Sequence, residues 1–207
     1  MPTKTQLKTF WFDLGNVILP FDFAPAYERL ALHGADPDAI RGFFGERPWL
    51  EAACDTGKVP APALYRMLRK HFSLRTLKYP EFKKIWNDIF EENREVSRLI
   101  RALKRQGFRL VLISNTNKLH FDHILRRYPV LREFHHHVLS YRLKTRKPGK
   151  KIYDRALRLS RAKKHQIFYT DDRKDFTGAA AGHGVHVHTF THAARLKRAL
   201  GRHGIKT

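Results

Sequence analysis

Thr9-Phe10-Trp11-Phe12-Asp13-Leu14-Gly15-Asn16 is the stretch that decides the fold. Its first four residues are β-branched or aromatic and predict a short strand, and the following Leu-Gly-Asn is typical of a turn. Asp13 therefore ends a strand. Because ligands of open α/β sheets bind outside the carboxyl ends of the strands, this carboxylate is the first candidate for a functional group.

The pattern changes to a helical one after Pro20. Between about residues 22 and 92, apolar residues recur at helical spacing and no strand-like alternation is present. Prolines punctuate this stretch at Pro37, Pro48, Pro60, Pro62 and Pro80. Since proline starts or stops helices, we expect a helical insert made of several short helices.

From about residue 94, helices and strands alternate. Four apolar runs predict strands, at residues 110–113, 138–140, 167–169 and 185–188. This alternation predicts an α/β fold: a three-layer, Rossmann-like parallel sheet with helices on both faces, and a small helical cap inserted after the first strand. We expect residues 1–21 and 93–207 to form the core and residues 22–92 to form the cap.

Composition restricts the class of protein. The chain has 207 residues, of which 42% are apolar, and its single cysteine excludes an internal disulfide and multi-cysteine metal sites. No apolar run reaches the roughly 18 residues of a membrane span. The first apolar run, Phe10 to Leu19, contains Asp13 and lacks a signal-peptide cleavage pattern. We therefore expect a cytoplasmic protein that does not enter a membrane.

Positive charge is concentrated in the second half of the chain. Residues 1–93 hold 13 Lys+Arg and 12 Asp+Glu, whereas residues 94–207 hold 28 and 7, within a formal net charge of +22. Such a half attracts polyanions and concentrates phosphorylated ligands near the surface. A solvated basic surface has the same composition, so the charge favours anionic ligands without identifying one.

Polar residues at the predicted strand ends are the main chemical signal. Asp13 ends the first strand, Ser114-Asn115-Thr116 the second and Asp171-Asp172 the fourth, and Lys147 precedes a helix expected to carry Pro148 in its first turn. Carboxylates, a hydroxyl and a lysine that converge on one sheet edge fit an aspartyl nucleophile, a hard cation and a bound phosphate.

Four segments, in order, resemble the four motifs of the haloacid dehalogenase (HAD) superfamily. They are Phe12-Asp13-Leu14-Gly15-Asn16-Val17-Ile18, Leu112-Ile113-Ser114-Asn115-Thr116-Asn117, Arg146-Lys147-Pro148 through Ile152-Tyr153, and Phe168-Tyr169-Thr170-Asp171-Asp172. The resemblance covers nearly the whole chain and includes Thr56-Gly57-Lys58-Val59 in the expected cap. It is closest to the capped phosphatase branch, which includes sugar-phosphate phosphatases similar to glucose-1-phosphate phosphatase and the phosphatase domain of soluble epoxide hydrolase. It implies a phosphoric monoester hydrolase acting on a small phosphorylated substrate.

The resemblance also implies a role for each motif residue. Asp13 would attack phosphorus and form an aspartyl-phosphate. Its carboxylate would also ligate Mg²⁺, together with the backbone carbonyl of Gly15 and the carboxylate of Asp172, while Asp171 would support the metal shell. Ser114 and the backbone N–H of Asn115 would hold the phosphoryl oxygens. Lys147 would offset the negative charge of nucleophile and phosphate.

Gly15 departs from the family pattern. Most phosphatases of the superfamily carry a second aspartate two residues after the nucleophile, which protonates the leaving oxygen and then activates water. A general acid–base contributes roughly 10²–10⁴-fold, so its absence predicts a slow phosphatase, a restriction to good leaving groups, or a borrowed carboxylate or water. The nearest spare carboxylate is Asp22, which also fits a helix N-cap, the interpretation that we favour.

Phe176 is a second departure, because relatives usually offer Asn or Asp four residues after the position of Asp172. Asp175 is one residue away. It can either replace the missing side chain near the metal or simply begin a helix, and the sequence leaves both interpretations open.

Two other functions remain as alternatives. A catalytically weak or inactive HAD-fold protein that binds nucleic acid or another polyanion would account for Gly15 and for the basic core. A 2-haloacid dehalogenase would share Asp13 as nucleophile; we disfavour it because that chemistry needs no acidic metal pair and because the position of Gly15 is usually Tyr there. The oligomeric state does not follow from the sequence.

Overall fold

The computed structural model describes residues 6–206, and its centre is a five-stranded parallel sheet. The strands are β1 (Thr9–Phe12), β2 (Arg109–Ser114), β3 (His136–Leu139), β4 (Ile167–Asp171) and β5 (His186–Thr189). Their order is β3-β2-β1-β4-β5, so β1 is central and pairs with both β2 and β4. The predicted α/β class and the parallel sheet are confirmed.

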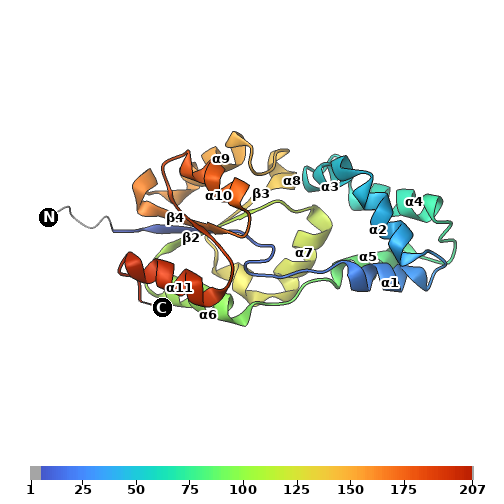
Figure 1. The fold of residues 1–207 in the computed structure, drawn as a ribbon, viewed down its shortest axis with the longest axis horizontal. Helices are drawn as coiled ribbons and strands as arrows, with labels where there is room; N and C mark the ends of the chain where they lie inside the picture. The colour runs from blue at the N-terminus through green and yellow to red at the C-terminus, as the bar shows by residue number, and fades with distance from the viewer. Residues whose placement is uncertain (1–5, 207) are drawn as a thin grey trace.

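Helices cover both faces of this sheet. They are α6 (Arg94–Arg105), α7 (Lys118–Arg127), α8 (Ser140–Leu143), α9 (Lys150–Ser160), α10 (Lys174–Ala181) and α11 (Ala193–Arg202), with short 3-10 turns η1 (Pro129–Glu133) and η2 (Lys164–Gln166). In Figure 1, α6 and α11 lie on one side of the sheet and α9 and α10 on the other. The core is therefore a three-layer sandwich.

The alternation of side chains along β1 explains the two hydrophobic layers. Phe10 and Phe12 are fully buried with the apolar residues of α6, α7 and α11. Trp11 points to the opposite face and is buried with residues of α9 and α10. A strand buried on both faces is mostly apolar, which is why Phe10, Trp11 and Phe12 form an apolar run in β1.

Five short helices lie between β1 and α6, and we call them the cap. They are α1 (Ala24–Ala31), α2 (Pro37–Gly45), α3 (Pro48–Asp55), α4 (Ala61–His71) and α5 (Tyr79–Asn87). All five carry proline in the first turn, where its missing N–H costs nothing. The cap has its own hydrophobic cluster and extends from one end of the sheet (Figure 1).

Two antiparallel segments connect the cap to the core. Phe21 bridges Phe90, the N–H of Asp22 donates to the carbonyl of Ile89, and the N–H of Glu91 donates to that of Pro20. The chain thus enters and leaves the cap at one place. None of the helices in residues 6–206 has the length and apolar character needed to cross a membrane.

Several predicted boundaries are wrong by a few residues. Ser140, predicted at the end of a strand, begins α8; its hydroxyl donates to the carbonyl of Asp55 and lies 3.0 Å from the carbonyl oxygen of Thr116. The helix after Lys147 starts at Lys150, so Pro148 precedes the helix instead of lying in its first turn. At Ser140 a tertiary contact, not local spacing, accompanies the start of the helix.

Candidate active site

The candidate site lies at the carboxyl ends of the central strands. Asp13 directly follows β1, and its N–H donates to the carbonyl of Thr170 in β4, 2.9 Å away. Ser114 ends β2 and Asp171 ends β4. The strand order reverses at β1, since β2 and β3 follow on one side of it and the chain then crosses to β4 and β5 on the other. Ligands of open α/β sheets bind at such a switch point.

Lys147 brings two of these carboxylates together. Its Nζ lies 2.6 Å from Asp13 Oδ1 and 2.6 Å from Asp171 Oδ2, and the lysine is 1% exposed. Burial opposes the charge of the ammonium, but the two carboxylates outweigh it and raise the pKa of Lys147. Burial also raises the pKa of Asp13 to about 7, against the attraction of Lys147. The buried ammonium of Lys147 therefore forms ion pairs with two carboxylates.

Asp171 is held rigidly. Its Oδ2 accepts hydrogen bonds from Lys147 and from the hydroxyl of Tyr169, and its Oδ1 accepts from the N–H of Arg173 at 3.0 Å. Tyr169 lies two residues earlier in β4, on the same face of the strand. The contact between Tyr169 and Asp171 was not predicted, although residues two apart in a strand lie on the same face and the sequence shows this spacing.

A third carboxylate completes an acidic group. Asp172 is half-buried, and burial raises its pKa while a hydrogen bond from Asn16, 3.1 Å from Nδ2 to Oδ2, opposes that effect. Asp13, Asp171 and Asp172 each offer a carboxylate oxygen, and these oxygens lie within 4.8 Å of one another. Hard oxygen donors at this spacing suit a hard divalent cation such as Mg²⁺. Lys147 pairs with Asp13 and Asp171, so a single ammonium faces three carboxylates among the described residues.

The side chain of Asn115 holds the backbone of Lys147. Its Oδ1 accepts from the N–H of Lys147 at 2.7 Å, and its Nδ2 donates to the carbonyl of Lys147 at 3.1 Å. The sequence predicts a role for the backbone N–H of Asn115, and no local pattern indicates this side-chain contact across 32 residues of chain. Ser114, buried beside it, places its hydroxyl 3.4 Å from the carbonyl of Asn115.

Gly15 and Asn16 form the tight loop after the nucleophile candidate. Gly15 bridges Leu19, and Asn16 adopts a positive φ of 56°, a conformation that asparagine tolerates better than most residues. The loop brings the amide of Asn16 to Asp172. The predicted backbone ligand Gly15 therefore lies in the same loop that contacts the acidic group.

Two further carboxylates, Asp175 and Asp22, lie outside the acidic group. Asp175 lies in the first turn of α10 and pairs with Arg173 at 2.7 Å, away from the acidic group. The ring of Phe176 instead faces Lys147 and Arg173, whose charged ends lie 4.9 and 4.2 Å from its centroid. Asp22 is exposed and accepts from the N–H of Ala24, the first residue of α1, but the N-cap residue is Phe23, so Asp22 lies one position before the N-cap position predicted for it.

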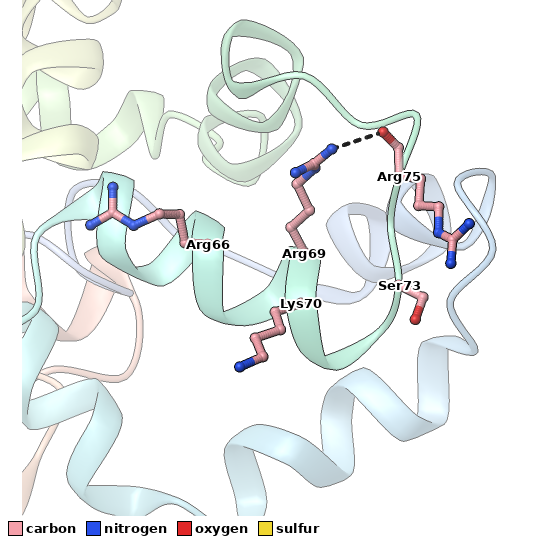
Figure 2. A pocket seen from close by; sticks show the side chains of 5 residues that line it. All are labelled: Arg66, Arg69, Lys70, Ser73 and Arg75. Atoms are coloured by element: carbon pink, nitrogen blue, oxygen red, sulfur yellow. Dashed lines mark hydrogen bonds between the residues drawn. The ribbon is translucent and has the colours of Figure 1, made fainter.

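A basic groove lies in the cap, apart from the strand edge. It has a volume of about 310 Å³ and is lined by Arg66, Arg69, Lys70, Ser73 and Arg75 (Figure 2). These residues come from α4 and the loop that follows it, and Arg69 donates to the carbonyl of Arg75 at 3.2 Å. The groove thus belongs to the nearly neutral half of the sequence, not to the basic residues 94–207.

Comparison with known proteins identifies a family. Residues 7–184 match the model of the haloacid dehalogenase-like hydrolases. Among solved structures, a predicted HAD-like family hydrolase from Porphyromonas gingivalis superposes with a TM-score of 0.80 at 20% identity, covering 98% of this chain and 100% of the other.

Two further structures share the fold. A HAD family enzyme from Bacteroides thetaiotaomicron, in complex with magnesium and inorganic phosphate, has a TM-score of 0.78 at 20% identity and covers 90% of this chain and 95% of the other. The L-2-haloacid dehalogenase from Xanthobacter autotrophicus, with chloropropionic acid covalently bound, has a TM-score of 0.62 at 10% identity and covers 88% and 76%. At these identities the likeness concerns the fold.

Proposed function

The chain belongs to the haloacid dehalogenase-like hydrolase family, and from that premise we propose that it is a Mg²⁺-dependent phosphatase. Its substrate is a small phosphorylated metabolite, such as a sugar phosphate, and the reaction passes through an aspartyl-phosphate on Asp13. The observation that carries this proposal is the acidic group of Asp13, Asp171 and Asp172, two of which contact Lys147.

The acidic group favours a phosphatase over the dehalogenases that share the fold. A phosphoryl group carries negative charge that must be neutralised before a carboxylate can attack it. A dehalogenase acts on a carbon–halogen bond and needs no acidic metal site. The magnesium and phosphate bound by the Bacteroides enzyme support the same assignment.

Asp13, Asp172 and the backbone carbonyl of Gly15 are proposed to hold Mg²⁺, and Asp171 to support them. When bound, the ion supplies positive charge to the phosphoryl oxygens and orients them. Lys147 provides a second, fixed positive charge beside the nucleophile. Its position depends on Asn115, which holds its backbone.

The remaining residues bind and position the substrate. Asp13 Oδ attacks phosphorus as the bond to the leaving oxygen breaks. The hydroxyl of Ser114 and the N–H of Asn115 donate hydrogen bonds to the phosphoryl oxygens, close to the start of α7, where helix N–H groups favour anions. Catalysis here consists mainly of positioning and electrostatic stabilisation.

We assign the chemistry to a core of residues 1–21 and 93–207, and substrate choice to a cap of residues 22–92 that excludes water from the site. Residues 1–5 and 207 of this core lie outside the described part of the chain. The cap has its own hydrophobic cluster and joins the core at one place, which supports the division.

Phosphate release from p-nitrophenyl phosphate tests the proposal. We expect hydrolysis with Mg²⁺, none with EDTA, and none from Asp13→Asn. Asp22→Asn is a matched control, because Asp22 is exposed and only contacts a helix start, and it should retain activity. Wild-type protein that releases no more phosphate than Asp13→Asn contradicts the proposal, and chloride release from 2-chloropropionate would indicate a dehalogenase instead. A screen of sugar phosphates and nucleotides then identifies the substrate class.

A further inference from the structure

Asp55 is a buried carboxylate of the cap that faces the core. It is the last residue of α3 and is 8% exposed. Figure 1 shows α3 beside α8, the short helix that begins at Ser140. The carbonyl of Asp55 accepts a hydrogen bond from Ser140 Oγ at 2.6 Å, so the end of α3 is fixed to the core.

The same serine connects Asp55 to the phosphate-binding loop. Ser140 Oγ accepts from the N–H of Thr116 at 2.9 Å and lies 3.0 Å from its carbonyl oxygen. Thr116 is two residues after Ser114, at the end of β2. The backbone of Asp55, a cap residue, is therefore tied to the segment that we expect to hold the phosphoryl oxygens.

The ion pair that would keep the Asp55 carboxylate ionised, with Arg146, is a long one. Arg146 Nη2 lies 3.7 Å from its Oδ2, which is longer than a hydrogen bond, and is closer to Glu51, at 3.0 Å. Burial raises the pKa of Asp55 to about 7; Glu51 adds to this effect, and Arg146 and Lys147 oppose it. Lys147 is the ammonium that contacts Asp13, so Asp55 and Asp13 are influenced by the same charge.

The other carboxylates near this edge have other tasks. Asp13, Asp171 and Asp172 form the acidic group. Asp22 accepts from the N–H of Ala24 at the start of α1, and Asp175 pairs with Arg173. Glu51, with a side chain that is 71% exposed, pairs with Arg146 at the surface. Within residues 6–206, the buried carboxylates are Asp13, Asp171 and Asp55, and of these Asp55 lies outside the acidic group.

We propose that Asp55 is the acid–base catalyst that Gly15 does not supply. This inference rests on the proposed phosphatase function. In the first step Asp13 bonds to phosphorus, the bond to the leaving oxygen breaks, and the proton of the Asp55 carboxyl passes to that oxygen, which leaves as an alcohol. In the second step the Asp55 carboxylate takes a proton from water, the water oxygen bonds to phosphorus, and the bond to Asp13 breaks to release phosphate. Asp55 ends protonated again.

A group that is partly protonated near neutral pH suits both steps, because it must first give a proton and then take one. Asp55 belongs to the cap, and this location affects water as well as substrate. The proton donor belongs to the part of the chain that covers the substrate, so a displaced cap removes it from the site. Water that enters an open site then meets no general base.

The leaving-group dependence of Asp55→Asn tests the proposal. A general acid matters for an alkyl phosphate, whose leaving alkoxide is very basic, and little for p-nitrophenyl phosphate. We expect Asp55→Asn to lower kcat/KM for the alkyl ester by at least about 10²-fold and for p-nitrophenyl phosphate by less than about 10-fold. In wild type, kcat/KM for the alkyl ester should fall above about pH 7, and this limb should be absent in Asp55→Asn.

Matched variants separate chemistry from structure. Asp38→Asn removes an exposed cap carboxylate, paired with Arg41, and should leave the ratio of the two kcat/KM values unchanged. Asp55→Glu keeps the acid and should retain a preference closer to wild type. Asp55→Ser gives a second acid-free variant if Asp55→Asn folds poorly, and binding of inorganic phosphate reports an intact site.

The outcomes distinguish the two proposals. Wild-type protein without Mg²⁺-dependent hydrolysis of either ester overturns the phosphatase assignment and this inference together. An active wild type whose Asp55 variants lose equal activity on both esters, with the alkaline limb retained, overturns only the inference. A selective loss on the alkyl ester supports both.

Discussion

The ring of Phe21 fills the space beside Gly15. A Cβ added to Gly15 would lie 2.9 Å from Phe21 Cε1, closer than the roughly 3.5–4.0 Å at which carbon atoms pack without bonding. The ring is 41% exposed and also packs against Phe23 and Phe90, with centroids 6.0 and 6.1 Å away. The usual second aspartate therefore cannot be introduced here without moving Phe21.

The first prediction follows from this contact. Gly15→Asp alone should lower the thermal midpoint and add little activity, because its side chain meets the ring. Combined with Phe21→Ala in an Asp55→Asn background, it should raise kcat/KM for an alkyl phosphate by about 10-fold or more and that for p-nitrophenyl phosphate by less. Phe21→Ala alone serves as the control. Equal gains on both esters would show that leaving-group protonation does not limit turnover.

A second prediction concerns Asn115. Asn115→Ala removes two hydrogen bonds to the backbone of Lys147 and should lower the free energy of unfolding by about 1–3 kcal/mol. It should also reduce kcat, since Lys147 is no longer held beside Asp13. Asn117→Ala, in the same loop, removes only the cap of α7 and should cost about 1 kcal/mol without changing kcat. Urea denaturation and steady-state kinetics measure both; equal kcat losses would contradict the role of Asn115.

Much of the fold could be predicted from periodicity. Strands buried on both faces must be continuous apolar runs, so β2 and β4 are visible in the sequence, and alternation with helices then predicts a parallel sheet. The start of α8 at Ser140 could not be predicted in this way. Its hydroxyl contacts Asp55, 85 residues away, and no local pattern reports such a contact.

In the candidate site too, some residues could be predicted from local sequence patterns and others could not. Asp13, Lys147 and Asp171 stand at strand ends or in motifs, and the sheet brings them into contact. Asn115 acts through its side chain and Asp55 through burial by a distant segment. Both properties depend on tertiary packing, so they cannot be predicted from composition or residue spacing.

A third prediction concerns Lys147. Lys147→Met leaves Asp13 and Asp171 buried without their shared cation, and breaking such a pair costs about 3–5 kcal/mol. With EDTA present, we expect a loss of this size in the free energy of unfolding, and with Mg²⁺ present we expect loss of phosphatase activity. Lys150→Met removes an exposed cation three residues later, paired with Asp154, and should cost less than about 1 kcal/mol. Similar stabilities of the two variants would contradict the buried contact.

His120 joins the core to the cap and leads to a prediction about pH. It lies in α7, is 6% exposed, and its Nδ1 is 3.1 Å from Oδ1 of Asn87, the last residue of α5. Burial lowers the pKa of His120 to about 3, and His123 adds to this effect. The folded protein therefore keeps this ring neutral, whereas the unfolded chain binds a proton below about pH 6.5.

Stability should consequently fall as the pH drops from about 6.5 toward 3, because the unfolded state binds more protons over that range. The slope for one histidine is at most about 1.4 kcal/mol per pH unit, or about 2 kcal/mol between pH 6.5 and 5. His120→Gln cannot be protonated, so it should be less stable than wild type at pH 7.5 and lose about 2 kcal/mol less on acidification to pH 5. Urea denaturation at both pH values measures the difference. If wild type and variant lose equal stability, His120 is protonated in the folded state and does not tie the cap to the core as a neutral ring.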